Sequence, residues 1–245
     1  AYTYVNSVDG IEKALIDAQK ICKVSPSISG FELPMNEDAE KVGGMFDKSI
    51  CSIEPESLLQ QGDDLISHVA SLDKEAKVTG GGIGVGVTAS QILSSEGIDQ
   101  AGMKSSHGLG IQVSIDKDEK ITSAWQSYSQ PSLIDFIPKE MDEAVHWARV
   151  TRNVVEVDKG AVDGKVIMIG GAFTPLFSMV VLSALSGEKY YNKESPWSGK
   201  LGNQVISKDL IIVDNPHLEA GKASARRDAE GVPTRVRELG SNGML

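Results

Sequence analysis

Residues 109–115 constrain the fold of this chain more than any other segment, because apolar side chains stand at every second position. These side chains are Leu109, Ile111, Val113 and Ile115. A two-residue period is typical of a β-strand with one buried face. Residues 78–87 alternate valine and isoleucine with small residues, and residues 95–97 and 116–118 have turn composition. We therefore predict an antiparallel meander over residues 77–130, not a series of βαβ units.

Three segments have the period of amphipathic helices: residues 9–23, 55–72 and 138–152. The second has a proline in its first turn. The third has acidic residues early and arginines late, which complements the helix dipole. A fourth helix is predicted from Thr174 to about Ser186. Because helices and antiparallel strands are segregated along the chain, the predicted fold class is α+β.

The glycine-flanked residues 160–164 mark the best candidate domain boundary. We predict the remainder of an N-terminal α+β domain over residues 1–160, an antiparallel sheet with packed helices, and the first part of a second α+β domain over residues 161–245. Short strands are expected at residues 166–169 and 210–213. The chain opens on a strand-like segment without an initiator methionine and stops just after a turn, so we interpret it as a fragment cut at both ends.

Composition disfavours several classes of protein. The 245 residues include 24 basic and 34 acidic side chains, which gives a net charge of −10 and opposes binding to a nucleic-acid backbone. The two cysteines do not form a disulfide framework, which favours a reduced, cytoplasmic setting. Residues 166–187 are uncharged and long enough to cross a bilayer. Gly170, Gly171 and Pro175 interrupt them, and a helix beginning at Thr174 is too short to span, so we expect no membrane association.

The spacing of reactive side chains predicts no catalytic or metal-binding motif. No two of the four histidines stand at ligand spacing, and Cys-x-x-Cys and Gly-x-Ser-x-Gly are absent. Gly84-x-Gly86-x-x-Ala89 fits a dinucleotide fingerprint, but the following helix and acidic partner are missing, which favours a flat strand. A basic stretch spans residues 222–237, either as a solvated loop or as a clamp for peptide carboxylates or a partner surface. Its cations are Lys222, Arg226, Arg227, Arg235 and Arg237.

Several segments resemble the TldD/PmbA family, also called the modulator-of-gyrase family. In the N-terminal part these are Tyr2-Thr3 with the helix that ends at residues 18–25, and Ser-Ser-Glu-Gly-Ile at residues 94–98 with the strand after it. The C-terminal motifs are more specific and follow the family's order and intervals. They are Leu-Ser-Ala-Leu-Ser-Gly-Glu at 182–188, Gly-Lys-Leu-Gly-Asn-Gln-Val at 199–205 and Asp-Ala-Glu-Gly-Val-Pro-Thr-Arg at 228–235.

The resemblance implies proteolysis by a pair of related subunits, one of which carries a zinc-binding His-Glu-x-x-x-His motif on a helix. Aligned on residues 185–188, the histidine positions fall at Ser178 and Ser183 and the glutamate position falls at Met179. A serine hydroxyl is a poor zinc ligand, and a methionine cannot act as a base. The chain therefore resembles the family's PmbA/TldE type of subunit. We expect no catalytic residue, metal or cofactor in it, and zinc in the partner subunit.

The partners implied by the resemblance are a TldD-like zinc-bearing subunit, in a dimer, and a peptide or unfolded polypeptide, but neither nucleic acid nor a membrane. Five residues of the matched segments are candidates for a substrate or partner surface, although structural turns would explain them almost as well. They are Gly199, Lys200, Asp228, Glu230 and Gly231. The alternative is a stand-alone peptide-binding or assembly protein without proteolytic activity, which would bind by strand addition. Direct action on DNA, suggested only by the older family name, is opposed by the net charge.

Overall fold

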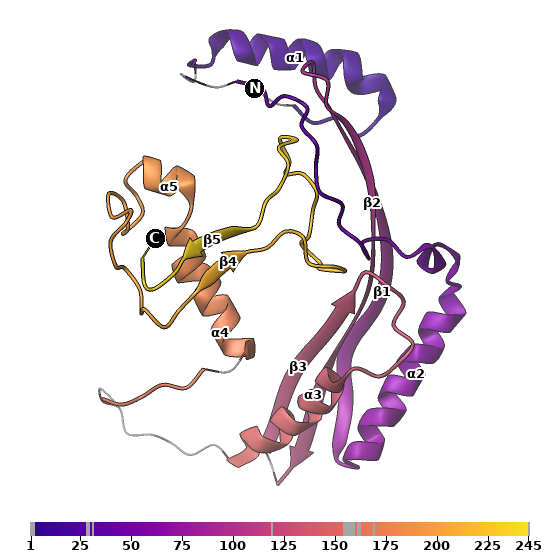
Figure 1. Ribbon diagram of the computed structural model, residues 1–245. Helices are drawn as coiled ribbons and strands as arrows, with labels where there is room; N and C mark the ends of the chain where they lie inside the picture. The colour runs from indigo at the N-terminus through magenta and orange to yellow at the C-terminus, as the bar shows by residue number, and fades with distance from the viewer. Residues whose placement is uncertain are drawn as a thin grey trace. The chain divides into compact units, whose positions relative to one another are not determined.

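Two compact units make up the chain, Ala1–Met35 and Asn36–Leu245. The computed structural model describes residues 3–27, 30, 32–118, 120–153, 160, 163–168 and 170–244. The first unit contains a short 3-10 helix, Val8–Gly10, followed by α1, Ile11–Val24 (Figure 1). The helix predicted over residues 9–23 is thus confirmed.

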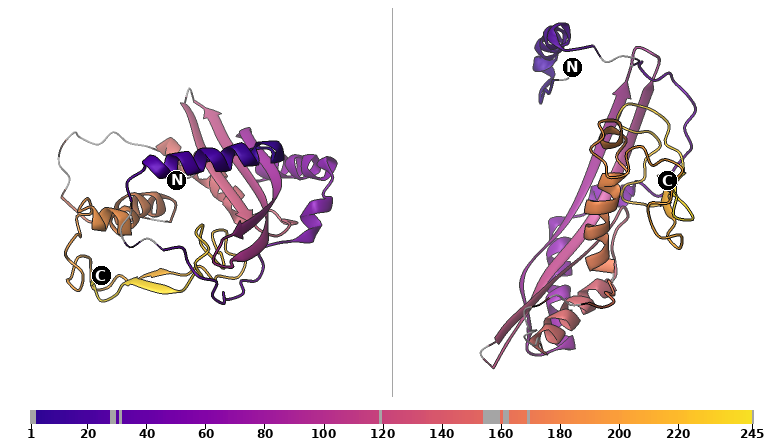
Figure 2. Two further views of the ribbon diagram at one scale, coloured as in Figure 1. Left: turned by 90° about the horizontal axis from the view of Figure 1, so that it is seen from above. Right: turned by 90° about the vertical axis from the view of Figure 1, so that its left-hand side faces the viewer.

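The second unit is built on a three-stranded antiparallel sheet with the strand order β1-β2-β3 (Figure 1). The strands are β1 (Ala76–Leu93), β2 (Asp99–Lys117) and β3 (Lys120–Gln130). β3 pairs only with residues 107–117 of β2, so β1 and the first part of β2 continue beyond it as a two-stranded arm (Figure 2). The predicted antiparallel meander and the α+β fold class are confirmed.

Glycines of β1 let the strands approach closely. A Cβ atom at Gly81 would lie 2.6 Å from the carbonyl oxygen of Gly110 on β2, closer than atoms can pack. The glycine fingerprint at residues 84–89 lies wholly within β1, and turn residues follow the strand. These glycines therefore serve a flat strand, and the dinucleotide interpretation is wrong because its helix is absent here.

The core lies between one face of the sheet and two helices, α2 (Pro55–Leu72) and α3 (Lys139–Val150). The odd-numbered residues of β2 from His107 to Ile115 are buried, as strand periodicity requires. The core cluster comprises Leu65, Val69, Ala76, Leu109, Ile111, Val113, Ile115, Ile134, Met141, Ala144, Val145 and Ala148. Both helices were predicted from their apolar stripes, and α2 has the predicted bounds.

The C-terminal part differs from prediction in two places. Residues 166–168 form no strand: the side chains of this apolar run lie exposed, and no strand among the described residues pairs with it. Ile169 falls outside the described residues. α4 (Gly170–Phe177) begins four residues before the predicted start at Thr174. A glycine costs a helix only about 1 kcal/mol, so Gly170 and Gly171 do not prevent it.

α4 continues into a π-helical turn, Ser178–Leu182, and the short α5 (Gly187–Tyr191) follows. Within the described part of the chain, one helix, Gly171–Tyr191, is long and apolar enough to cross a membrane by length and composition. The prediction that this helix is too short to span a bilayer was wrong, because the helix begins before Thr174 and continues beyond Ser186. A single such helix is weak evidence for insertion, since core helices of soluble proteins have the same character.

Two short strands, β4 (Ile212–Asp214) and β5 (Arg237–Gly240), pair antiparallel near the end of the chain. The strand predicted at residues 210–213 is thus present but begins two residues later. The proposed domain boundary near residue 160 stays a prediction, because the division between the two compact units falls after Met35 and concerns a different part of the chain.

Candidate functional site

The five residues predicted as a substrate or partner surface lie in two turns. Gly199 has a φ of +74°, and the neighbouring Lys200 is exposed, with its amide donating to the carbonyl of Trp197 at 2.9 Å. In the other turn, Oδ1 of Asp228 accepts the amides of Glu230 and Val232, each at 2.9 Å. Within the described residues no hydrogen bond or ion pair joins the two turns. Turn formation accounts for these residues, and a binding role for them stays a prediction.

Gly231 is the member of this set whose surroundings leave no room for a side chain. It is buried with a φ of +92°, and a Cβ atom there would lie 2.8 Å from Cδ1 of Ile98, at the turn between β1 and β2. Gly231 also accepts a hydrogen bond at its carbonyl from Nη1 of Arg227, at 2.6 Å. This turn therefore packs the C-terminal region onto the end of the sheet.

The three positions aligned with the zinc motif lie on the apolar helix. Ser178 and Met179 fall in the π-helical turn, a rare geometry that is often found at functional sites. The side chain of Met179 is 68% exposed, and the hydroxyl of Ser183 accepts a hydrogen bond from Nζ of Lys189 at 2.5 Å. A thioether and two hydroxyls do not fit a zinc centre. Among the described residues, no three His, Cys, Asp or Glu side chains gather closely enough to hold a metal ion.

Two arginines of the basic stretch at residues 222–237 bind other groups of the protein itself. Arg226 donates from Nε to the carbonyl of Glu40 and from Nη2 to that of Ala39, each at 3.2 Å. Arg235 pairs with the carboxylate of Glu37 at 3.1 Å. Arg226 thus holds the connecting segment of residues 36–47 against the C-terminal region, whereas the pair of Arg235 and Glu37 lies mostly in solvent.

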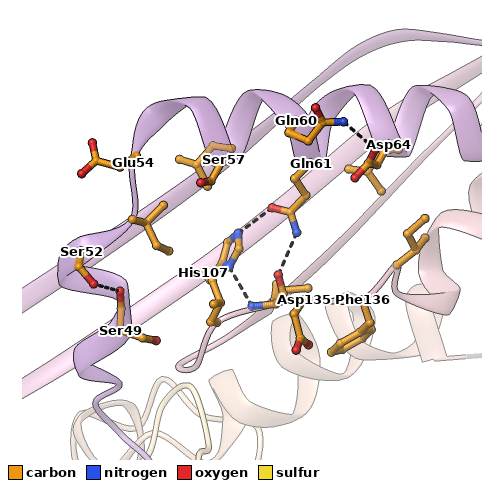
Figure 3. A pocket seen from close by; sticks show the side chains of 16 residues that line it. Ser49, Ser52, Glu54, Ser57, Gln60, Gln61, Asp64, His107, Asp135 and Phe136 are labelled. Carbon is orange, nitrogen blue, oxygen red and sulfur yellow. Dashed lines mark hydrogen bonds between the residues drawn. The ribbon is translucent and has the colours of Figure 1, made fainter.

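A pocket of about 660 Å³ lies beside α2, which the sequence analysis did not identify (Figure 3). Its walls are α2, the 3-10 helix Lys48–Ser52 and residues 133–137. Three carboxylates line it, from Glu54, Asp64 and Asp135, and no lysine or arginine does. The lining comes from residues 49–65, His107 and residues 133–137, which are separated in the sequence, so no local motif could reveal it.

His107 closes the pocket floor through a ring of hydrogen bonds (Figure 3). Its Nδ1 accepts the amide of Ile134 at 2.9 Å, which leaves the proton on Nε2 to donate to Oε1 of Gln61 at 3.0 Å. Gln61 in turn donates from Nε2 to the carbonyl of Ile134 at 3.0 Å. The imidazole is only 1% exposed, and this burial lowers the pKa of His107. With both ring nitrogens occupied, His107 holds the pocket wall in place.

Asp47 ties the same walls together from outside the pocket. Its Oδ2 accepts the amide of Leu133 at 3.0 Å, and its Oδ1 accepts the hydroxyl and amide of Ser49 at 2.6 and 2.9 Å. The hydrogen bond from the Ser49 hydroxyl, followed by those from the two amides, lowers the pKa of Asp47. The amide of Asp47 donates to the hydroxyl of Ser105 on β2 at 2.8 Å. One carboxylate thus fixes residues 47–49 and 133 to the sheet.

Comparison with known proteins adds a second line of evidence. Residues 162–245 match the family described as PmbA/TldA metallopeptidase C-terminal domain. A protein of Methanocaldococcus jannaschii named only MJ0231 is 25% identical over all 245 residues, and the chain covers 55% of its length. Metalloprotease PmbA of Escherichia coli O157:H7 is 36% identical over 80 residues, which are 33% of this chain and 18% of that protein. The chain thus spans about half the length of the first of these relatives.

Solved structures show the same fold. The crystal structure of TldE from Thermococcus kodakarensis matches with a TM-score of 0.81 at 23% identity, covering 99% of this chain and 55% of that one. A structure from Bacteroides thetaiotaomicron described as a modulator of DNA gyrase matches with a TM-score of 0.78 at 20% identity, covering 99% and 56%.

An α+β fold with a PmbA/TldA-type C-terminal segment defines the class of protein. Residues 162–245 thus match this family, as the C-terminal motifs had indicated, and the fold of the chain is that of the TldE structure.

Substitutions at Gly231 and Gly199 distinguish the effect of close packing from the effect of a positive φ. We expect Gly231→Ala to lower the free energy of unfolding by about 1–3 kcal/mol more than Gly199→Ala, because both have positive φ but only Gly231 faces a buried side chain. Urea unfolding of the two variants measures the difference. Equal losses would show that Gly231 does not pack on Ile98.

The buried imidazole predicts a pH dependence of stability. The pKa of His107 lies below its unfolded value of 6.5, so as the pH falls below about 6.5 the unfolded chain takes up this proton before the folded one. The free energy of unfolding therefore decreases below that pH, by at most about 1.4 kcal/mol per unit, and is insensitive to this group above it. His107→Asn keeps an acceptor for the Ile134 amide and should flatten the slope.

Urea unfolding of both proteins across this pH range tests the assignment, because the other three histidines are present in each and cancel in the comparison. A variant with the same slope as the parent would contradict a neutral, buried His107.

Proposed function

We propose that this chain is the PmbA/TldE-like subunit of a TldD/PmbA-type metallopeptidase complex. In this role it completes a peptide-binding chamber and binds no zinc itself. The observation that carries the proposal is the chemistry at the three motif positions. Ser178, Met179 and Ser183 provide neither the imidazoles that zinc requires nor a carboxylate base. The hydrolytic chemistry then belongs to a partner with the complete motif.

The apolar helix of residues 171–191 supports a subunit that works in an assembly. Only 6% of its most apolar window is buried, although its sequence is that of a buried helix. The large exposed side chains on it are Phe173, Leu176, Met179, Val180, Leu182 and Tyr191. Contiguous exposed apolar surface of this kind marks sites of interaction.

The proposed partner is a TldD-like subunit that carries the zinc, in a dimer with this chain. The proposed substrate is a peptide or an unfolded polypeptide, and the proposed setting is the cytoplasm. The acidic pocket beside α2 supports a binding role, because its histidine is held by hydrogen bonds on both nitrogens and is unavailable as a base.

A second candidate function is a stand-alone peptide-binding protein. β1 lies at the edge of the sheet in the described part of the chain, with β2 as its neighbour. An exposed edge strand can accept an extended peptide by strand addition. This mode requires no zinc-bearing partner, which is the difference that an experiment can detect.

Zinc content and peptide cleavage discriminate between the two functions. The full-length parent protein is expressed alone and together with the relative that has the His-Glu-x-x-x-His motif. We expect stoichiometric zinc by elemental analysis, and cleavage of an unfolded polypeptide, only in the co-purified complex. Ser178→Ala in this chain should leave the zinc content unchanged, whereas replacing a motif histidine of the relative by alanine should abolish zinc and cleavage.

Stoichiometric zinc in the parent protein alone would contradict the proposal, because ligands elsewhere would then converge. A parent protein that forms no complex with the relative, but binds peptides by itself, would establish the stand-alone function.

A further inference from the structure

A second pocket, of about 220 Å³, lies on the other side of β2 from the acidic pocket's histidine. Its walls are the connecting segment at Val42 and Met45, the two-stranded arm of β1 and β2, and residues 224–227. Three cations line it, Lys104, Arg226 and Arg227, and no acidic side chain does. Its charge is thus opposite to that of the pocket beside α2 and to that of the chain as a whole.

The three cations have only neutral partners among the described residues. Nζ of Lys104 donates to the carbonyl of Ser224 at 2.7 Å, and Arg226 donates to the two carbonyls of the connecting segment. Arg227 donates to the carbonyls of Gly231 and Glu37 and to the side-chain oxygen of Asn36. By contrast, other cations of the chain pair with carboxylates, and these include Lys117, Arg149 and Arg235.

Donor capacity remains on these cations. Lysine has three N–H donors, and Lys104 uses one in the described chain. Nε of Arg227 is buried and has no acceptor among the described residues. A buried donor without an acceptor is costly, and Arg227, which carries this one, lines the pocket.

The rest of the pocket lining is mainly apolar, so an anion that fits it must carry an apolar group. The apolar residues Val42, Met45 and Ile92 line it. A bare inorganic anion would leave this apolar wall without contacts. The volume is below the roughly 300–1,000 Å³ of pockets that hold drug-sized molecules, which restricts the ligand to a small group.

We infer that this pocket binds the C-terminal carboxylate of a peptide whose last residue is apolar. The three cations would take the carboxylate, because arginine and lysine form strong charge-assisted hydrogen bonds with it, and Val42, Met45 and Ile92 would take the side chain. The inference rests on the proposed function in binding peptides and gives that function a preferred peptide end. It also separates two cations of the basic stretch from the others. Arg226 and Arg227 line the pocket together with Lys104, which precedes Arg226 by 122 residues.

Paired peptides test the inference on the full-length protein. Two peptides of one sequence ending in leucine carry a fluorophore at the N-terminus, one with a free C-terminal carboxylate and the other with a C-terminal amide. We expect fluorescence anisotropy to show about tenfold tighter binding of the free acid. A third peptide, ending in glutamate with a free carboxylate, should bind more weakly than the leucine peptide because the wall is apolar.

Variants of Lys104 locate the preference in this pocket. Lys104→Gln should reduce the preference for the free acid to threefold or less, or about 0.65 kcal/mol or less, while its amide can still donate to Ser224. Lys104→Arg should retain the preference because it keeps the charge. Arg237→Gln is the matched control, since Arg237 is an exposed cation of the same basic stretch that does not line the pocket. Thermal unfolding of each variant confirms that it is folded.

Equal binding of the acid and the amide would overturn the inference, as would equal effects of Lys104→Gln and Arg237→Gln. Displacement of the free-acid peptide by inorganic phosphate, with no advantage for the leucine end over the glutamate end, would show a general anion site and would also overturn it. These results are independent of the zinc assay. If the carboxylate preference is absent but zinc still depends on the relative, the pocket assignment is refuted and the subunit assignment stands. If the carboxylate preference is present but the protein has no zinc-bearing partner, the subunit assignment is refuted and the pocket assignment stands.

Discussion

The pairing of β1 with β2 is the constraint on which the rest of the second unit depends. The two strands stay in register from Ala76 opposite Ile115 to Leu93 opposite Asp99, with one irregularity between Val78 and Gly80. Because strand side chains alternate between faces, a slip of one residue would expose the whole apolar set of β2 to water. Packing of α2 and α3 on that set therefore fixes the register as much as the backbone hydrogen bonds do.

The same strand register determines the side of the sheet on which each pocket lies. His107 lies on the helix-facing side of β2 and forms the floor of the acidic pocket, while Lys104, three residues earlier, lies on the other side and lines the cationic pocket. The connecting segment of residues 36–47 fixes their surroundings. Asp47 holds the loop at Leu133 on one side, and the carbonyls of Ala39 and Glu40 hold Arg226 on the other. Two pockets of opposite charge thus depend on one strand and one connecting segment.

The sequence predicted those parts of the fold that depend on residues close together in the chain. The strict alternation from Leu109 to Ile115 identified the central strand, and a proline at the first helical position with a continuous apolar stripe gave α2 its correct bounds. Prediction failed at residues 166–168, where an apolar run without a pairing partner is not a strand. It also failed at Gly170, where the small cost of glycine in a helix was overestimated.

The pockets could not be predicted because the residues that form them lie far apart in the sequence. Lys104, Arg226 and the backbone of Ala39 meet across more than 60 residues of sequence, and no spacing rule connects them. His107 did give a clue. It shares the parity of Leu109, so alternation places it on the buried face, and a buried imidazole requires hydrogen-bond partners. The sequence did not reveal that those partners are Gln61 and the backbone of Ile134.

The central claim, that this chain is the zinc-free half of a two-subunit peptidase, is tested most directly by native mass spectrometry. The full-length protein would be co-purified with its motif-bearing relative and sprayed from a non-denaturing buffer. The account predicts a complex containing both subunits, with zinc retained by the relative and not by this chain when the complex is dissociated in the gas phase. Zinc that leaves with this chain, or a protein that never associates with the relative, would contradict the account.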